Sequence, residues 1–97
     1  MKERVVTRAG HTFTVVDDFP QWPDGHVNNV DFWGLYGTGV WEPTLDDILR
    51  RHLPPRRTFV DVGAWIGPVT LLASRLAEHV FAVEPDPTAV LGFQANM

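Results

Sequence analysis

The stretch TFVDVGAWIGPVTLLAS, residues 58–74, decides the fold of this chain. An apolar run reaches Asp61, Gly63 and Gly67 follow, and a helical pattern of apolar residues begins after them. A strand, a glycine turn and a helix in this order are typical of sites for nucleotide-like ligands. Glycine suits such a turn because it adopts positive φ and lets a ligand approach the backbone. The amide groups at the start of the following helix offer hydrogen bonds to an anionic group.

The segments that follow repeat the alternation of strand and helix. IGPVTLLASRLAE, residues 66–78, predicts a helix in which Pro68 is tolerated because it lies in the first turn. HVFAVEP, residues 79–85, predicts a second strand, and DPTAVLGFQANM, residues 86–97, begins another helix. The β-α-β-α order implies parallel strands joined by a right-handed crossover. The continuous apolar character of the strands predicts that they are buried on both faces.

A further helix is predicted before the first of these strands. WEPTLDDILRRHL, residues 41–53, has aspartates in the first turn of the expected helix, where anions favour the helix dipole. Two prolines at 54 and 55 end it. Its apolar face is predicted to combine residues at i, i+3, i+4 and i+8, namely Leu45, Ile48, Leu49 and Leu53.

The N-terminal part has a different pattern. RVVTRAGHTFTVV, residues 4–16, predicts a hairpin with strands 4–7 and 12–16 around a glycine turn. Residues 19–39 are dense in Pro, Gly, Asn and Asp, which predicts an ordered loop with one turn of helix. Aromatic residues in and just after this loop are predicted to pack against the sheet: Trp22, Phe32, Trp33, Tyr36 and Trp41. We therefore divide the chain into a hairpin and aromatic loop extension, residues 1–40, and a ligand-binding part, residues 41–97.

Composition restricts the class of protein. The chain has 97 residues, 44% of them hydrophobic, and a formal net charge of -4, so we expect one globular domain with no nucleic acid as partner. It has no cysteine, and its histidines lack the spacing of metal ligands, so we expect no metal. No signal peptide or membrane-length apolar run is present. These features predict a cytoplasmic protein with no membrane contact.

The spacing of glycines and acids distinguishes two cofactors. Glu84 lies 21 residues after Gly63, the distance at which a βαβ unit brings a carboxylate to a ribose diol. The dinucleotide pattern G-x-G-x-x-G would require glycine at 65 and 68, which are Trp65 and Pro68. The acid-x-G-x-G-x-G pattern of S-adenosylmethionine sites matches at Asp61, Gly63 and Gly67 and departs only at position 65. The spacing therefore favours S-adenosylmethionine over NAD.

The same motifs resemble the FkbM-type branch of class I methyltransferases, which has D-V-G-A-N-I-G, then E-P-x-P, then an Asn in the next helix. The matching residues lie between positions 41 and 96: Asp61, Gly63, Ala64, Ile66, Gly67, Glu84, Pro85, Pro87 and Asn96. Trp65 stands where asparagine is common in the family. The resemblance implies an α/β, Rossmann-like class I methyltransferase fold and S-adenosyl-L-methionine as cofactor. It also implies methyl transfer to a hydroxyl oxygen of a small-molecule or carbohydrate substrate.

The resemblance also implies roles for individual residues. Asp61 and the loop of Gly63, Ala64, Trp65 and Gly67 would hold the methionine part of the cofactor, and Glu84 its ribose. Adenine contacts, acceptor site and catalytic residues would come after the second strand and its following helix, where this sequence stops. We therefore expect an N-terminal, cofactor-binding part of an enzyme, preceded by a β-hairpin and inactive by itself.

Other interpretations of the same residues stay open. The glycines could serve only tight packing of strand against helix, Asp61 could cap that helix, and Trp65 could be a core residue. Asn96 could be a family feature or a residue of the helix surface. At the level of function, the alternatives are a non-catalytic Rossmann-like ligand-binding or interaction module and a βαβ fragment that binds nothing. Continuation of the strand-helix alternation downstream would favour the enzyme.

Overall fold

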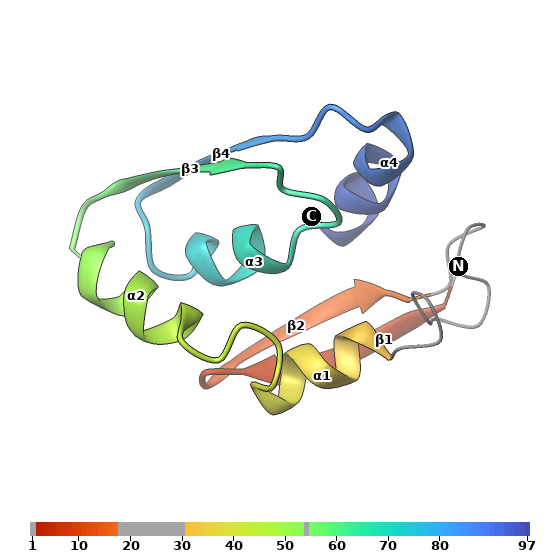
Figure 1. Cartoon of the computed structure of the whole chain (residues 1–97), viewed down its shortest axis with the longest axis horizontal. Coiled ribbons are helices and arrows are strands. Elements are labelled where there is room, and N and C mark those ends of the chain that lie inside the picture. The colour runs from red at the N-terminus through yellow and green to blue at the C-terminus, as the bar shows by residue number, and fades with distance from the viewer. Residues whose placement is uncertain (1, 18–30, 54) are drawn as a thin grey trace. The chain divides into compact units, whose positions relative to one another are not determined.

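The computed structural model of the chain describes residues 2–17, 31–53 and 55–97 (Figure 1). It consists of two compact units, Met1–Pro43 and Thr44–Met97. No helix in these described ranges is both long enough and apolar enough to cross a membrane.

The N-terminal unit begins with an antiparallel hairpin. Strands β1 (Glu3–Arg8) and β2 (His11–Val16) pair from Glu3 opposite Val16 to Arg8 opposite His11. The two residues between the strands, Ala9 and Gly10, both have positive φ, at 53° and 79°. Positive φ at both central positions is the geometry of a type I′ turn, whose twist matches that of the strands. The predicted hairpin is confirmed.

A capped helix follows where a loop was predicted. Helix α1 (Phe32–Thr38) begins at Asp31, whose side chain accepts a hydrogen bond from Gly34 N, and it ends at Gly39, which has φ of 80°. The prediction of a loop with one helical turn is wrong for this segment, because the Asp and Gly taken as turn residues are the two caps of a helix. The rest of that prediction, with Trp22, lies outside the described residues.

Aromatic packing in this unit surrounds a buried arginine. The predicted packing role is confirmed for the α1 aromatics, because Phe32, Trp33 and Tyr36 are buried and α1 packs on β1. Arg8 of β1 is only 2% exposed. Its guanidinium lies 4.8 Å from the Tyr36 ring centre and donates hydrogen bonds to the Trp41 and Glu42 carbonyls at 2.7 and 2.9 Å. Carbonyl acceptors and ring faces thus replace water around this buried cation.

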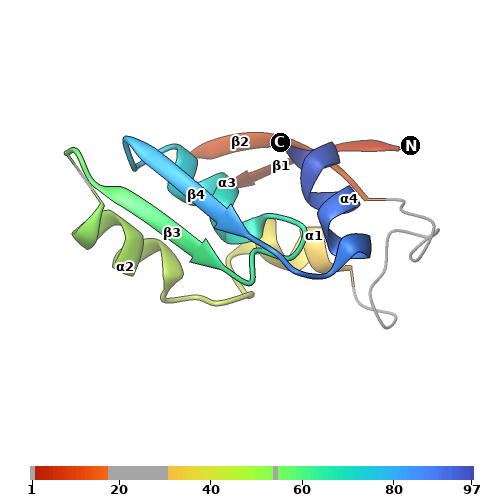
Figure 2. The ribbon, with the colours of Figure 1, turned by 90° about the horizontal axis from the view of Figure 1, so that it is seen from above.

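The C-terminal unit has the predicted β-α-β-α order. After α2 (Leu45–His52), it contains β3 (Thr58–Val62), α3 (Pro68–Ser74), β4 (His79–Val83) and α4 (Pro87–Asn96). The two strands run side by side in the same direction, with Thr58 opposite His79 and Val62 opposite Val83 (Figure 2). The predicted parallel strand-helix-strand unit is confirmed, and Pro68 lies in the first turn of α3 as expected.

The buried face of helix α2 is narrower than the sequence predicted. Leu49 and Leu53 are buried and Leu45 is half-buried, which leaves a stripe at spacing i, i+4 and i+8. Ile48, predicted to share this face, is 51% exposed. The prediction was wrong there because the packing of α3 against α2 buries a narrow stripe that leaves Ile48 outside.

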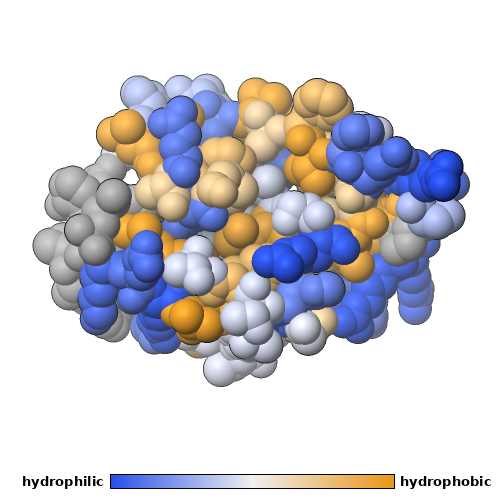
Figure 3. All heavy atoms as spheres, turned by 180° about the vertical axis from the view of Figure 1, so that it is seen from behind, coloured by the Kyte–Doolittle hydropathy of each residue, from blue (hydrophilic) through white to orange (hydrophobic). Residues whose placement is uncertain are grey.

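One face of the β3–β4 sheet is open to solvent. Helix α3 packs on the opposite face (Figure 1), where Asp61 is buried. The open face carries apolar side chains that are 53–79% exposed: Val60, Val62, Phe81 and Val83. Exposed apolar residues are visible in the space-filling view (Figure 3). The prediction of burial on both faces is wrong, because no element among the described residues of this unit covers the second face.

Candidate functional site

The turn between β3 and α3 has a left-handed backbone at three of its five positions. Gly63, Trp65 and Gly67 have φ of 79°, 55° and 104°. A side chain in this conformation costs roughly 1–2 kcal/mol, and only Gly, Asn and Asp adopt it readily. Asparagine, which is common at position 65 in the FkbM-type branch, suits a left-handed backbone. Trp65 adopts the same conformation with steric strain.

The two glycines do different things. A Cβ placed on Gly63 would meet no atom within 4 Å, so the backbone there faces open space. A Cβ on Gly67 would overlap the end of the Met97 side chain and lie 3.4 Å from Phe93 Cδ2. Tight packing against a helix therefore explains part of the need for glycine at 67. At position 63 it does not, and the open backbone leaves room for a ligand.

Glu84 is fixed beside this turn by two backbone amides. Its Oε1 accepts a hydrogen bond from Trp65 N at 2.7 Å, and its Oε2 accepts one from Asp86 N at 2.9 Å. The residue is half-buried at the end of β4. Because each carboxylate oxygen has two lone pairs, Glu84 retains acceptor capacity for hydroxyl groups of a ligand. The carboxylate is held in place before any ligand arrives.

The amides of the turn donate hydrogen bonds inside the unit. Gly63 N and Ala64 N both donate to the Val83 carbonyl, at 2.8 and 3.0 Å, and Gly67 N donates to the Ala64 carbonyl. Pro68, the first residue of α3, has no N–H. The start of α3 therefore offers fewer donors to an anionic group than the sequence pattern indicated. A ligand at this turn has the exposed Gly63 surface and the Glu84 carboxylate as its polar neighbours.

Asp61 lies beneath the turn. It is 7% exposed, and its Oδ2 accepts a hydrogen bond of 2.6 Å from the Thr70 hydroxyl in α3. The contact is with a side chain of the first helical turn, and α3 begins without a side-chain cap. The predicted capping role is thus replaced by a strand-to-helix hydrogen bond. Contact between Asp61 and a ligand stays a prediction.

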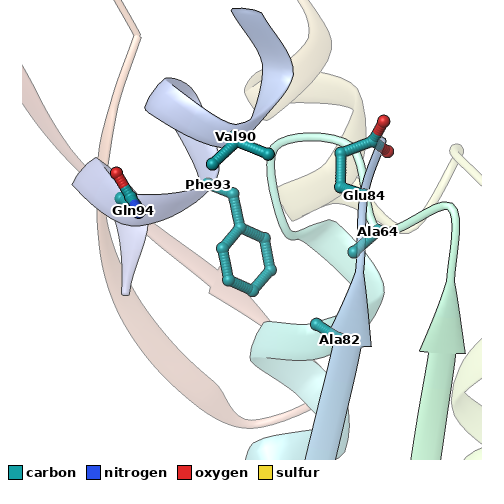
Figure 4. Close-up of a pocket in the computed structure, with 6 residues that line it drawn as sticks. All are labelled: Ala64, Ala82, Glu84, Val90, Phe93 and Gln94. Carbon is teal, nitrogen blue, oxygen red and sulfur yellow. The ribbon is translucent and has the colours of Figure 1, made fainter. Parts of the chain in front are cut away.

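A cavity of about 250 Å³ opens beside the turn. It is lined by residues of the turn, β4 and α4: Ala64, Ala82, Glu84, Val90, Phe93 and Gln94. The Phe93 ring extends from α4 toward β4, opposite Ala64 and Ala82, and the Glu84 carboxylate is directed away from the ring (Figure 4). An apolar wall with one carboxylate at its edge suits a ligand that has carbon rings and hydroxyl groups. Ligand pockets usually measure about 300–1,000 Å³, so this cavity would take part of such a molecule.

The structure brings most of the predicted site residues together. Ala64 and Glu84 line the cavity, and Trp65 is joined to Glu84 by its backbone amide. Gly63, Trp65 and Gly67 are not among the lining residues. Helix α4 contributes a wall of the cavity that was not predicted from the sequence. Its residues Val90, Phe93 and Gln94 stand at i, i+3 and i+4, a spacing that places them on one helix face and could have revealed them.

The sequence left two roles open for Asn96, a family feature or a residue of the helix surface. It is 6% exposed, and its Nδ2 donates a hydrogen bond of 2.9 Å to the Ile66 carbonyl in the turn. The residue is therefore a buried contact of the turn, and its interpretation as helix surface is wrong.

Two curated proteins are similar to this chain over most of its length. Both are described as ribosomal protein L11 methyltransferase, one from Bacillus cereus (strain Q1) and one from Bacillus cytotoxicus. Each is 32% identical over 93 residues, which cover 89% of this chain and 30% of the relative. The chain thus spans about 30% of the length of these relatives.

The other comparisons give no match. No family model matches the chain, and no solved structure matches it. Both relatives carry the name methyltransferase, and the small parallel α/β unit is compatible with part of a Rossmann-like fold. The FkbM branch is not singled out by them.

Proposed function

We propose that this chain forms the cofactor-binding part of an S-adenosylmethionine-dependent methyltransferase. The observation that carries the proposal is the position of Glu84. Two backbone amides hold its carboxylate at the edge of an apolar cavity, next to the open backbone of Gly63. The methyltransferase relatives support the same function independently.

The residues fit the cofactor in chemical type. The lone pairs that Glu84 retains can accept two ribose hydroxyls, and hydrogen bonds to a charged acceptor contribute about 1.5–3 kcal/mol each. Ala64, Val90 and Phe93 offer an apolar wall to the nucleoside. The open backbone at Gly63 would accept the methionine part, and the bond between Asp61 and Thr70 would keep β3 and α3 in place beneath it.

The cofactor would supply a methyl group on a positive sulfur, which is already a good leaving group. The work left to the protein is to orient this donor and hold an acceptor in line with it. Within the present chain, Glu84 and the turn perform the first task. The relatives are longer than this chain, and the residues that would hold the acceptor are proposed to correspond to the rest of their length.

Two classes of acceptor are proposed. The resemblance to the FkbM branch favours O-methylation of a small-molecule or sugar hydroxyl. The relatives favour a second candidate, a protein acceptor, because their names describe methylation of a ribosomal protein. A methyl-transfer assay with labelled S-adenosylmethionine distinguishes them when hydroxyl compounds and ribosomal proteins are offered in parallel to the full-length enzyme.

Calorimetry tests the cofactor assignment. We expect the wild-type protein to bind S-adenosylmethionine and S-adenosylhomocysteine, with NAD at least tenfold weaker. Preference for NAD would reject the assignment. Binding of S-adenosylmethionine by a full-length protein that transfers methyl to neither acceptor class would favour the non-catalytic ligand-binding module.

A further inference from the structure

The last residue of α4 forms a buried contact with the turn. Asn96 is 6% exposed, and its side-chain amide donates to the Ile66 carbonyl at 2.9 Å, across 30 positions of sequence. Asn96 has this long-range bond although it ends a helix whose other polar residues near it, such as Gln94, are exposed. A buried amide aimed at one backbone carbonyl calls for an explanation.

The carbonyl that Asn96 contacts lies between two left-handed residues of the turn. Ile66 stands between Trp65, with φ of 55°, and Gly67, with φ of 104°. Left-handed residues persist only where surrounding contacts hold them. Hydrogen bonds from the end of β4 hold the first half of the turn, through the Val83 carbonyl and Glu84. The Asn96 amide holds the second half from α4.

Helix α4 therefore contributes both to the cavity and to the turn. Phe93, one helical turn before Asn96, lines the cavity and lies next to Gly67. A shift of α4 would move the cavity wall and release the Ile66 carbonyl together. The Trp65 amide, whose partner is Glu84, belongs to the residue next to Ile66. If the Asn96 bond is lost, movement of Ile66 would shift the adjacent Trp65 amide and thereby the Glu84 carboxylate that it holds.

We infer that Asn96 is a positioning residue: its amide keeps Trp65 and Gly67 in their left-handed conformation and thereby orients Glu84 for the ligand. The ligand part of this inference rests on the proposed function. The conformational part stands on the contacts of the turn alone.

The test uses a variant with the same number of side-chain heavy atoms. Asn96→Leu keeps the size of the side chain and removes the donor, and Ala95→Leu, at the exposed neighbouring position of α4, is the matched control. The full-length protein is labelled with 5-fluorotryptophan, and the fluorine signals of Trp33, Trp41 and Trp65 are each assigned with a Trp→Phe substitution at that position. We expect Asn96→Leu to shift or broaden the Trp65 signal, whereas those of Trp33 and Trp41 stay in place. A purely structural role would lower the melting temperature and leave the native Trp65 signal unchanged, and that result would overturn the inference.

A measurement on the wild-type protein covers the case in which Asn96→Leu does not fold. Nuclear magnetic resonance detects the scalar coupling across the hydrogen bond between Asn96 Nδ2 and the Ile66 carbonyl carbon. We expect this coupling to be present, and its absence in the folded protein would overturn the inference.

Calorimetry with S-adenosylmethionine then separates the two proposals. We expect Asn96→Leu to weaken binding about tenfold, which corresponds to about 1.4 kcal/mol, and Ala95→Leu to leave it unchanged. If the wild-type protein does not bind the cofactor, the proposed function fails while the fluorine and coupling data still decide the role of Asn96. If Asn96→Leu binds as tightly as wild type, the positioning role fails alone.

Discussion

The backbone amide of Trp65 donates a hydrogen bond of 2.7 Å to Glu84 Oε1, so the glycine turn and the acid after the second strand form one unit. The sequence pattern had assigned them separate tasks, the turn for one end of the ligand and the acid for the other. In the structure, the acid also stabilises the left-handed residue of the turn. Changes at Glu84 are therefore expected to affect both ligand binding and the conformation of the turn.

Substitution of Glu84 tests this double role. We expect Glu84→Ala to weaken binding of S-adenosylmethionine tenfold or more, because hydrogen bonds to a carboxylate contribute about 1.5–3 kcal/mol each. Glu84→Gln keeps one carbonyl acceptor, so its affinity should lie between those of the wild type and Glu84→Ala. Calorimetry measures the affinities, with Glu3→Ala, an exposed glutamate of β1, as control. Unchanged affinity in Glu84→Ala would reject the ribose role.

The two glycines should respond differently to alanine. Both substitutions place a Cβ at positive φ, which costs about 1–2 kcal/mol of stability. We expect Gly63→Ala to reduce ligand affinity beyond this cost, because its Cβ would project into the open space where the ligand approaches. Gly67→Ala should mainly lower stability, since its Cβ meets Met97 and Phe93. Denaturant unfolding and calorimetry on both variants separate the effects, and equal affinity loss would contradict the distinction.

The buried bond between Asp61 and Thr70 is expected to stabilise the unit. Thr70→Val keeps the shape of the side chain but leaves Asp61 Oδ2 without its 2.6 Å donor. A buried acceptor that loses its partner costs about 1–3 kcal/mol. Urea unfolding of the full-length protein should show this loss in Thr70→Val but not in Thr58→Val, at an exposed position of β3. Equal stability of wild type and Thr70→Val would show that water replaces the hydroxyl at no cost.

The open face of the β3–β4 sheet predicts how the 97-residue chain behaves in solution. Val60, Val62, Phe81 and Val83 expose apolar side chains on it, and a strand edge without a partner associates readily with other chains. We expect the chain to self-associate, to melt without a sharp transition and to lack methyl-transfer activity. Light scattering and thermal unfolding check this prediction.

A charged substitution provides the control for association. Phe81→Lys places a cation on the open face and should reduce the scattering. Leu91→Lys, at a position of α4 that is 66% exposed, should reduce it less. A monodisperse wild-type monomer that melts cooperatively and turns over the cofactor would contradict both predictions.

The sequence by itself determined the local elements of this protein. Apolar runs around Gly63 and Gly67 were enough to predict the parallel strand-helix-strand unit. Gly10 and the strand-like runs on both sides of it were enough to predict the hairpin. These features depend on neighbours in the chain, because φ preferences and hydrophobic periodicity act over a few residues. For the same reason Asp31 and Gly39 were misread, since an isolated turn and a helix cap use the same residues.

Only the tertiary structure decided which groups meet. Asn96 contacts Ile66 across 30 positions, Glu84 contacts Trp65 across 19, and Arg8 contacts Glu42 across 34. Burial of the Asn96 amide and of the Arg8 guanidinium requires carbonyl partners that the path of the chain supplies, and no local pattern encodes that path. The open β3–β4 face has the same origin: apolar strands favour burial, but whether a face is buried depends on which elements pack against it.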